Sequence, residues 1–111
     1  MSVEQAQVID AIGVNDNNGH LELLIDDRID WSNEGKHIQM LQEKLDMYLH
    51  FVLEGQIWEH FNDPEDLKRN VCFVVRFEHD LTENAQEFLD FFKISLIQHK
   101  IMLGWVIEKK S

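Results

Sequence analysis

Four short segments of the chain carry the apolar pattern of β-strands. Residues 8–14 and 20–26 place apolar side chains at alternate positions, and the turn sequence Asn-Asp-Asn-Asn-Gly separates them. Residues 71–78 alternate in the same way, and residues 101–107 are apolar along most of their length. A period of two is typical of strands with one buried face, and Asn and Gly favour the backbone of tight turns. We therefore predict a β-hairpin near the N-terminus and two later strands.

Two longer segments have the helical period of 3.6 residues instead. The spacing of their apolar residues predicts a first helix over 34–54, which ends at Gly55, and a second over 83–99, which Thr82 caps and Lys100 closes. The candidate caps of the first helix are Asp30, Ser32 and Asn33. The predicted buried stripes are Ile38, Leu41, Leu45, Tyr48, Leu49 and Val52 in the first helix, and Ala85, Phe88, Leu89, Phe92 and Leu96 in the second.

The resulting order of elements, β-β-α-β-α-β, predicts an α+β fold. We expect a two-layer sandwich in which two helices pack on one face of a four-stranded mixed sheet. The last two strands are joined through the second helix, which favours a right-handed parallel crossover, whereas the sequence leaves the order of the strands open. We expect a single domain over residues 1–111, with an irregular segment, residues 56–70, between the first helix and the third strand.

The composition is that of a folded protein in a reducing compartment. Of the 111 residues, 44% are hydrophobic, and a single cysteine, Cys72, excludes an intramolecular disulfide. No apolar run approaches the roughly 20 residues that a membrane helix needs, and the N-terminus lacks the pattern of a secretory signal. We therefore expect a cytoplasmic location.

Charge excludes some partners and favours others. The chain has 10 basic and 21 acidic residues, a formal net charge of −11. Such an acidic chain would repel nucleic acids and anionic membranes, so we expect neither as a partner. The acids are concentrated in residues 1–34, with a net charge of −7, while residues 81–111 are neutral. This field would attract a basic partner protein, although solvated acidic surfaces commonly serve solubility alone.

Three stretches of the sequence resemble a known family. Residues 8–14 (VIDAIGV), 26–34 (DDRIDWSNE) and 41–57 (LQEKLDMYLHFVLEGQI) are similar to an uncharacterised family of small bacterial proteins, known only as a domain of unknown function. The similarity extends more loosely to the C-terminus. It implies a stand-alone bacterial cytoplasmic domain, and it supplies no activity, cofactor or functional residue.

The residues that could carry chemistry form no recognised motif. The six histidines are His20, His37, His50, His60, His79 and His99, and none lies three to five residues from another, the usual spacing of zinc ligands. Cys72 has no CxxC partner, and a buried, inert thiol is its expected state. Phosphate-binding loops and the serine-hydrolase elbow are absent. We therefore expect no metal and no cofactor, and we favour a function other than catalysis.

An acidic cluster lies where the second strand is expected to meet the first helix. Asp26, Asp27 and Asp30, with Glu34, could bind a hard cation such as calcium, but the EF-hand spacing is absent. Capping and interaction with the helix dipole explain Asp30 and Glu34 without a metal.

Acids together with aromatic residues suggest a protein-binding surface. Large aromatic side chains rimmed by acids are typical of interface hot spots, and loops also use them to attach to a core. The hypothesis is a non-enzymatic acidic protein-binding module, in its specific form an immunity or inhibitor protein that neutralises a basic toxin. Its predicted contact residues are Asp26, Asp27, Asp30, Trp31, Trp58 and Glu59.

Two alternatives remain open at this stage. The first is an enzyme or small-ligand-binding protein with a pocket between the sheet and residues 56–70, in which His60 and Arg76 would supply polar groups. The second is a homodimer formed through an exposed strand edge or sheet face.

Overall fold

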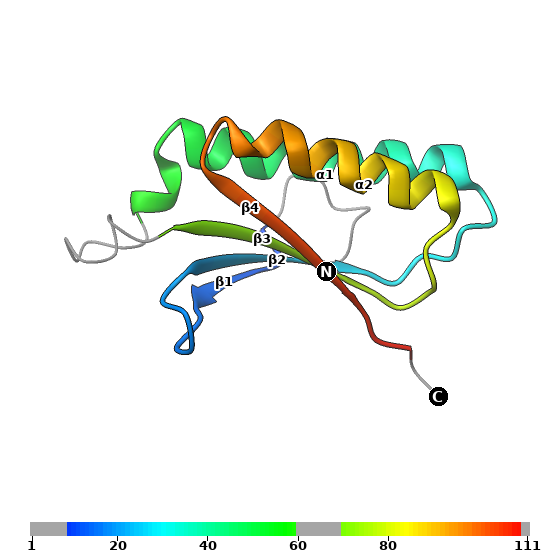
Figure 1. Ribbon diagram of the computed structural model, residues 1–111, viewed down its shortest axis with the longest axis horizontal. Coiled ribbons are helices and arrows are strands. Elements are labelled where there is room, and N and C mark those ends of the chain that lie inside the picture. Colours follow the sequence, from blue (N-terminus) through cyan, green and yellow to red (C-terminus); the bar gives the residue numbers. More distant parts are fainter. Residues whose placement is uncertain (1–8, 60–69, 110–111) are drawn as a thin grey trace.

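The secondary structure follows the predicted order of elements. A computed structural model describes residues 9–59 and 70–109, without the side chains of residues 58 and 59. The elements are β1 (Ala11–Val14), β2 (Leu21–Asp27), α1 (Glu34–Leu53), a 3-10 helix η1 (Gln56–Glu59), β3 (Val71–Phe77), α2 (Glu83–Ile97) and β4 (Ile101–Ile107). Figure 1 shows α1 and α2 side by side on the same face of the sheet. The predicted α+β architecture is therefore confirmed.

The four strands form one mixed sheet in the order β1-β2-β3-β4. Strand β1 runs antiparallel to β2, as the predicted hairpin requires, while β2, β3 and β4 are parallel to one another. Each parallel neighbour follows a helix, because a parallel connection needs a crossover that returns the chain to the same end of the sheet. The predicted parallel pairing of the last two strands is confirmed.

The core lies between the sheet and the two helices. Alternate residues of β2 and β3 are buried beneath the helices, as the period of two predicted. Helix α1 contributes Leu41, Leu45 and Tyr48, all without exposed surface. Of the predicted stripes, Ile38, Leu49, Val52 and Phe88 are only partly buried.

The ends of the elements follow local chemistry. Asn33 is the N-cap of α1, and Thr82 is the N-cap of α2, where its side chain accepts a hydrogen bond from the Ala85 N–H. Gly55 has a φ of 79°, the left-handed turn expected after α1. The helices end at Leu53 and Ile97, slightly earlier than predicted. Strand β1 begins at Ala11 rather than at residue 8, which itself lies outside the described residues.

A charged pair lies in the core, between Lys44 of α1 and Asp10 just before β1, and the sequence pattern did not predict it. The Nζ atom of Lys44 is 2.9 Å from Oδ1 of Asp10, and both side chains are almost fully buried. The Tyr48 hydroxyl accepts a hydrogen bond from the Asp10 N–H and donates one to the Leu24 carbonyl. These contacts join the hairpin to the middle of α1.

Candidate functional site

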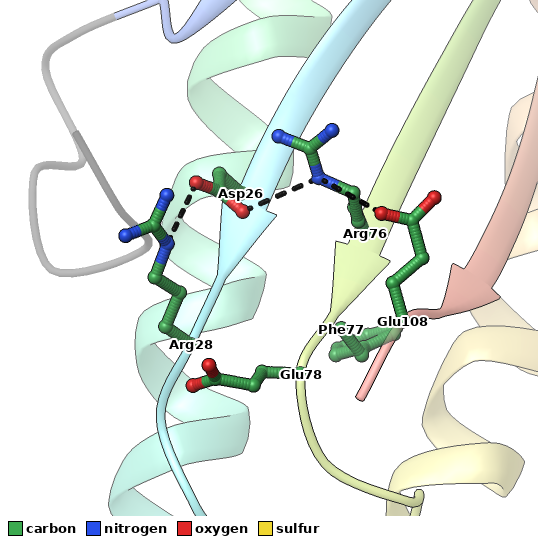
Figure 2. A pocket seen from close by; sticks show the side chains of 6 residues that line it. All are labelled: Asp26, Arg28, Arg76, Phe77, Glu78 and Glu108. Atoms are coloured by element: carbon green, nitrogen blue, oxygen red, sulfur yellow. Dashed lines mark hydrogen bonds and ion pairs between the residues drawn. The ribbon is translucent and has the colours of Figure 1, made fainter. Parts of the chain in front are cut away.

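Asp26, near the end of β2, belongs to a network of ion pairs. Asp26 lies 3.1 Å from Nε of Arg28 and 3.6 Å from Nε of Arg76, and Arg76 lies 3.8 Å from a carboxylate oxygen of Glu108. Figure 2 shows this row of alternating charges across the carboxyl ends of β2, β3 and β4. The row borders a shallow hollow of about 240 Å³. Its charges largely neutralise one another.

Asp27 points to the opposite side of the sheet and is buried beneath α1. One carboxylate oxygen lies 2.6 Å from Nε2 of His37, and the other accepts the Ile29 N–H. His37 is 1% exposed, and its Nδ1 lies 3.0 Å from the carbonyl oxygen of Asp30. Since that carbonyl can only accept, Nδ1 carries a proton. The pair holds the β2–α1 loop against the helix.

Trp31 and Asp30 complete this loop. The Trp31 ring stacks on His37 with 3.7 Å between ring centroids, and it also contacts Phe77. Asp30 is exposed, and hydrogen bonds from Ser32 hold the pKa of its carboxyl below the ordinary value. Of the predicted contact residues in this loop, the structure therefore exposes Asp30, half-buries Asp26 and Trp31, and buries Asp27.

Most of the remaining predicted site residues lie outside the described part of the chain. The side chains of Trp58 and Glu59 and the whole of His60 lie outside the described residues, as does most of the proposed pocket beside residues 56–70. Arg76 lies on the open face of the sheet, in the hollow of Figure 2. Of the two polar groups predicted for that pocket, His60 and Arg76, the structure therefore describes Arg76 alone.

Histidine, cysteine and carboxylate side chains are the candidate metal ligands and nucleophiles of the described part of the chain. No group of three or more His, Cys, Asp or Glu side chains there could hold a metal ion. Cys72 is half-buried on the open face of the sheet, and burial, aided by the charge of Glu22, raises the pKa of its thiol. A raised pKa leaves less thiolate near neutral pH and so lowers reactivity.

Helix α2 presents three large apolar side chains to solvent, which we call the α2 stripe. Phe91 is 74% exposed, Ile94 69% and Ile97 65%. Phe92 and Leu96, which are buried, each lie two residues from Ile94, and residues two apart point to opposite sides of a helix. The stripe therefore lies on the outer face of α2, opposite the face that is buried in the core. Clustered exposed apolar side chains of this kind mark contact sites.

The helical period of residues 83–99 predicted the buried face of α2, and the α2 stripe was not among the predicted site residues. A signal was present, because positions 91, 94 and 97 are apolar although they fall off the buried stripe of the same helix. A helix with large apolar residues on both faces is either enclosed or in contact with another surface.

Fold and surface together define a two-layer α+β protein with an apolar outer helix face. A family model matches residues 1–109, and the chain belongs to that family, a family of unknown function (DUF6572). The resemblance to a domain of unknown function is thus confirmed, and the bacterial origin stays a prediction. No curated protein and no solved structure is significantly similar to the chain. Among the described residues, no helix is long and apolar enough to cross a membrane.

Proposed function

We propose that this chain is a protein-binding module that contacts its partner through the α2 stripe. The observation that carries the proposal is the exposure of Phe91, Ile94 and Ile97, each about two-thirds exposed or more, within two turns of one helix. Covering these side chains removes apolar surface from water, the main favourable contribution to protein association. Large apolar anchors near the centre of a contact also dominate its energetics.

The α2 stripe is held on a rigid support. Thr82 caps the helix, and its inner face is buried against β4 and the rest of the core. The Nζ atom of Lys93 lies 5.8 Å from the centre of the Trp105 ring, a further contact between α2 and β4. A preformed surface loses little conformational entropy on binding, so more of the contact energy appears as affinity.

A basic partner, as for an immunity or inhibitor protein, is a finer form of this proposal. The net charge of −11 supports it, because long-range attraction speeds encounter with a basic protein. Asp26, Asp27 and Trp31 make internal contacts that hold the β2–α1 loop. For such a basic partner, the acidic residues would steer the encounter and the α2 stripe would form the contact.

Small-ligand binding is the second candidate, and one observation favours it. The hollow of Figure 2 lies at the carboxyl ends of three parallel strands, where open α/β sheets bind their ligands. Its two arginines, Arg28 and Arg76, are already paired with carboxylates, which weakens its case as an anion site. Protein binding through the α2 stripe is the better supported function.

Site-specific photocrosslinking in cells that naturally express the chain tests the proposal. A photoreactive amino acid replaces Ile94 in one variant and His50 in a control, whose side chain is 71% exposed on α1. We expect position 94 to form a discrete covalent adduct with a protein and position 50 to form none. Equal adduct yields at both positions, or no protein adduct at position 94, would count against a binding role for the α2 stripe.

A further inference from the structure

We infer that the partner of the α2 stripe is a second copy of this chain. In this arrangement, two α2 helices pack antiparallel across a two-fold axis that passes beside Ile94. The inference rests on the proposed function, because it names the protein that covers the stripe. Three properties of α2 support it: the spacing of the stripe, the charge along the helix and the neutrality of the C-terminal segment.

The spacing of the stripe is symmetric about its central residue. Phe91 and Ile97 each lie three residues from Ile94, or about 4.5 Å along the helix axis. A two-fold axis beside Ile94 therefore places the two Ile94 side chains opposite each other, with Phe91 of one copy level with Ile97 of the other. A two-fold interface requires a surface that complements itself in this way. Residues three apart form a row inclined about 45° to the helix axis, so in an antiparallel pair the Ile94 side chains meet at the centre, and Phe91 and Ile97 lie on either side of them.

Charge along α2 complements itself in the same arrangement. The helix carries three exposed acids before the stripe, Glu83, Glu87 and Asp90, and the exposed base Lys100 follows the end of the helix. In an antiparallel pair, the acidic first half of each helix lies beside Lys100 of the other copy. A parallel pair would instead bring the acids of both copies together. The charge pattern therefore favours the antiparallel pair.

The distribution of net charge lowers the electrostatic repulsion between two copies at the proposed contact. Two chains with a net charge of −11 repel each other, but residues 81–111, which contain α2 and β4, carry four acids and four bases. The proposed contact thus lies in the segment of each copy that has no net charge. The remaining repulsion acts over a longer distance, so added salt should screen it and strengthen the dimer. A complex with a basic protein would weaken under the same change.

Cysteine pairing tests the two-fold axis directly. Each variant carries Cys72→Ala and one new cysteine, introduced as Ile94→Cys, Phe91→Cys, Ile97→Cys or, as a control, Leu53→Cys. Leu53 is 51% exposed at the end of α1. Helices packed about 8–10 Å apart bring facing Cα atoms within disulfide range. All four sites are exposed, so circular dichroism should show an unchanged fold.

We expect a distinctive pattern of disulfides in a glutathione redox buffer. Ile94→Cys should form a homodimer as its major product, and a mixture of Phe91→Cys with Ile97→Cys should form the mixed dimer in preference to either homodimer. Leu53→Cys should form no disulfide-linked dimer. A dimer without this pattern, as pairing through the edge of β4 would give, overturns the inference. An adduct of position 94 with a different protein, with no disulfide at Ile94→Cys, overturns it too but leaves the proposed function standing.

Discussion

At the scale of single residues, the buried pair of Asp27 and His37 explains why part of the acidic cluster is structural. The carboxylate lies 2.6 Å from the imidazole, and neither side chain is more than 1% exposed. Deep burial of a charged group is costly unless it is paired and hydrogen-bonded. This pair meets that condition through Ile29 and Asp30. Asp27 therefore stabilises the start of α1 and has no surface with which to meet a partner.

The pair yields a stability prediction. Asp27→Ala should lower the free energy of unfolding by about 3–5 kcal/mol, because it leaves His37 buried without its partner. Urea denaturation followed by circular dichroism measures the change. The matched control is Asp16→Ala in the exposed hairpin turn, which should change the value by less than about 0.5 kcal/mol. Similar values for the two variants would show that the pair does not hold the loop.

Tyr48 provides a second test at this scale, through pH. Burial, together with the charge of Asp10, raises the pKa of its phenol well above the ordinary value. Because the folded state favours the neutral phenol, this contribution to stability is complete below about pH 10 and is lost as the pH rises further. The hydroxyl also donates to the Leu24 carbonyl, a hydrogen bond that only the neutral form can make.

The chain contains a single tyrosine, so its ionisation can be followed without interference. We expect phenolate absorbance to appear only together with loss of the circular dichroism signal, in one cooperative alkaline transition. Tyr48→Phe should remove the absorbance change and serves as the control. A smooth titration near pH 10 with the fold intact would contradict the buried position of the hydroxyl.

At the scale of elements, hydrophobic periodicity predicted most of the fold. Strand β4 matches its predicted range, and α1 begins at the predicted Glu34. The strand order could not be predicted, because it depends on where each crossover returns the chain and not on the pattern within any one strand. Parallel pairing of β2 with β3 became visible only in the structure.

Helix α1 shows why part of the core was missed. His37, Leu41, Lys44 and Tyr48 recur at helical spacing, and all four are buried. Two of them are polar, so a search for apolar residues passed over positions that the helical period itself places on the inner face. Their partners, Asp27 and Asp10, lie 10 and 34 residues away in the sequence, and the pattern of either segment alone does not reveal such pairs.

The sequence pattern also could not show which residues of the candidate site are exposed. The sequence identified acids and aromatic residues near the β2–α1 loop as contacts, but composition cannot tell an exposed Asp30 from a buried Asp27 three residues away. The α2 stripe, by contrast, follows from helical spacing once the inner face is known. The exposure of a side chain depends on how the helices and the sheet pack together, so it became known only from the structure.

At the scale of the whole molecule, the two layers divide structural and contact roles. The inner faces of the helices and sheet form the core, ion pairs and hydrogen bonds within the fold hold the β2–α1 loop, and the outer face of α2 keeps an apolar stripe in water. A net charge of −11 favours solubility despite this stripe. A partner that covers the stripe would remove its apolar side chains from water.

The most direct test is the mass of the chain in solution by sedimentation equilibrium. We predict that the wild-type chain approaches twice its 13.2 kDa mass as concentration rises, more readily in high salt than in low salt. Ile94→Lys should stay at the monomer mass, while the control Leu53→Lys should behave like the wild type. A wild-type chain that stays monomeric at every concentration and salt level, or an Ile94→Lys variant that dimerises equally well, would contradict self-association through the α2 stripe.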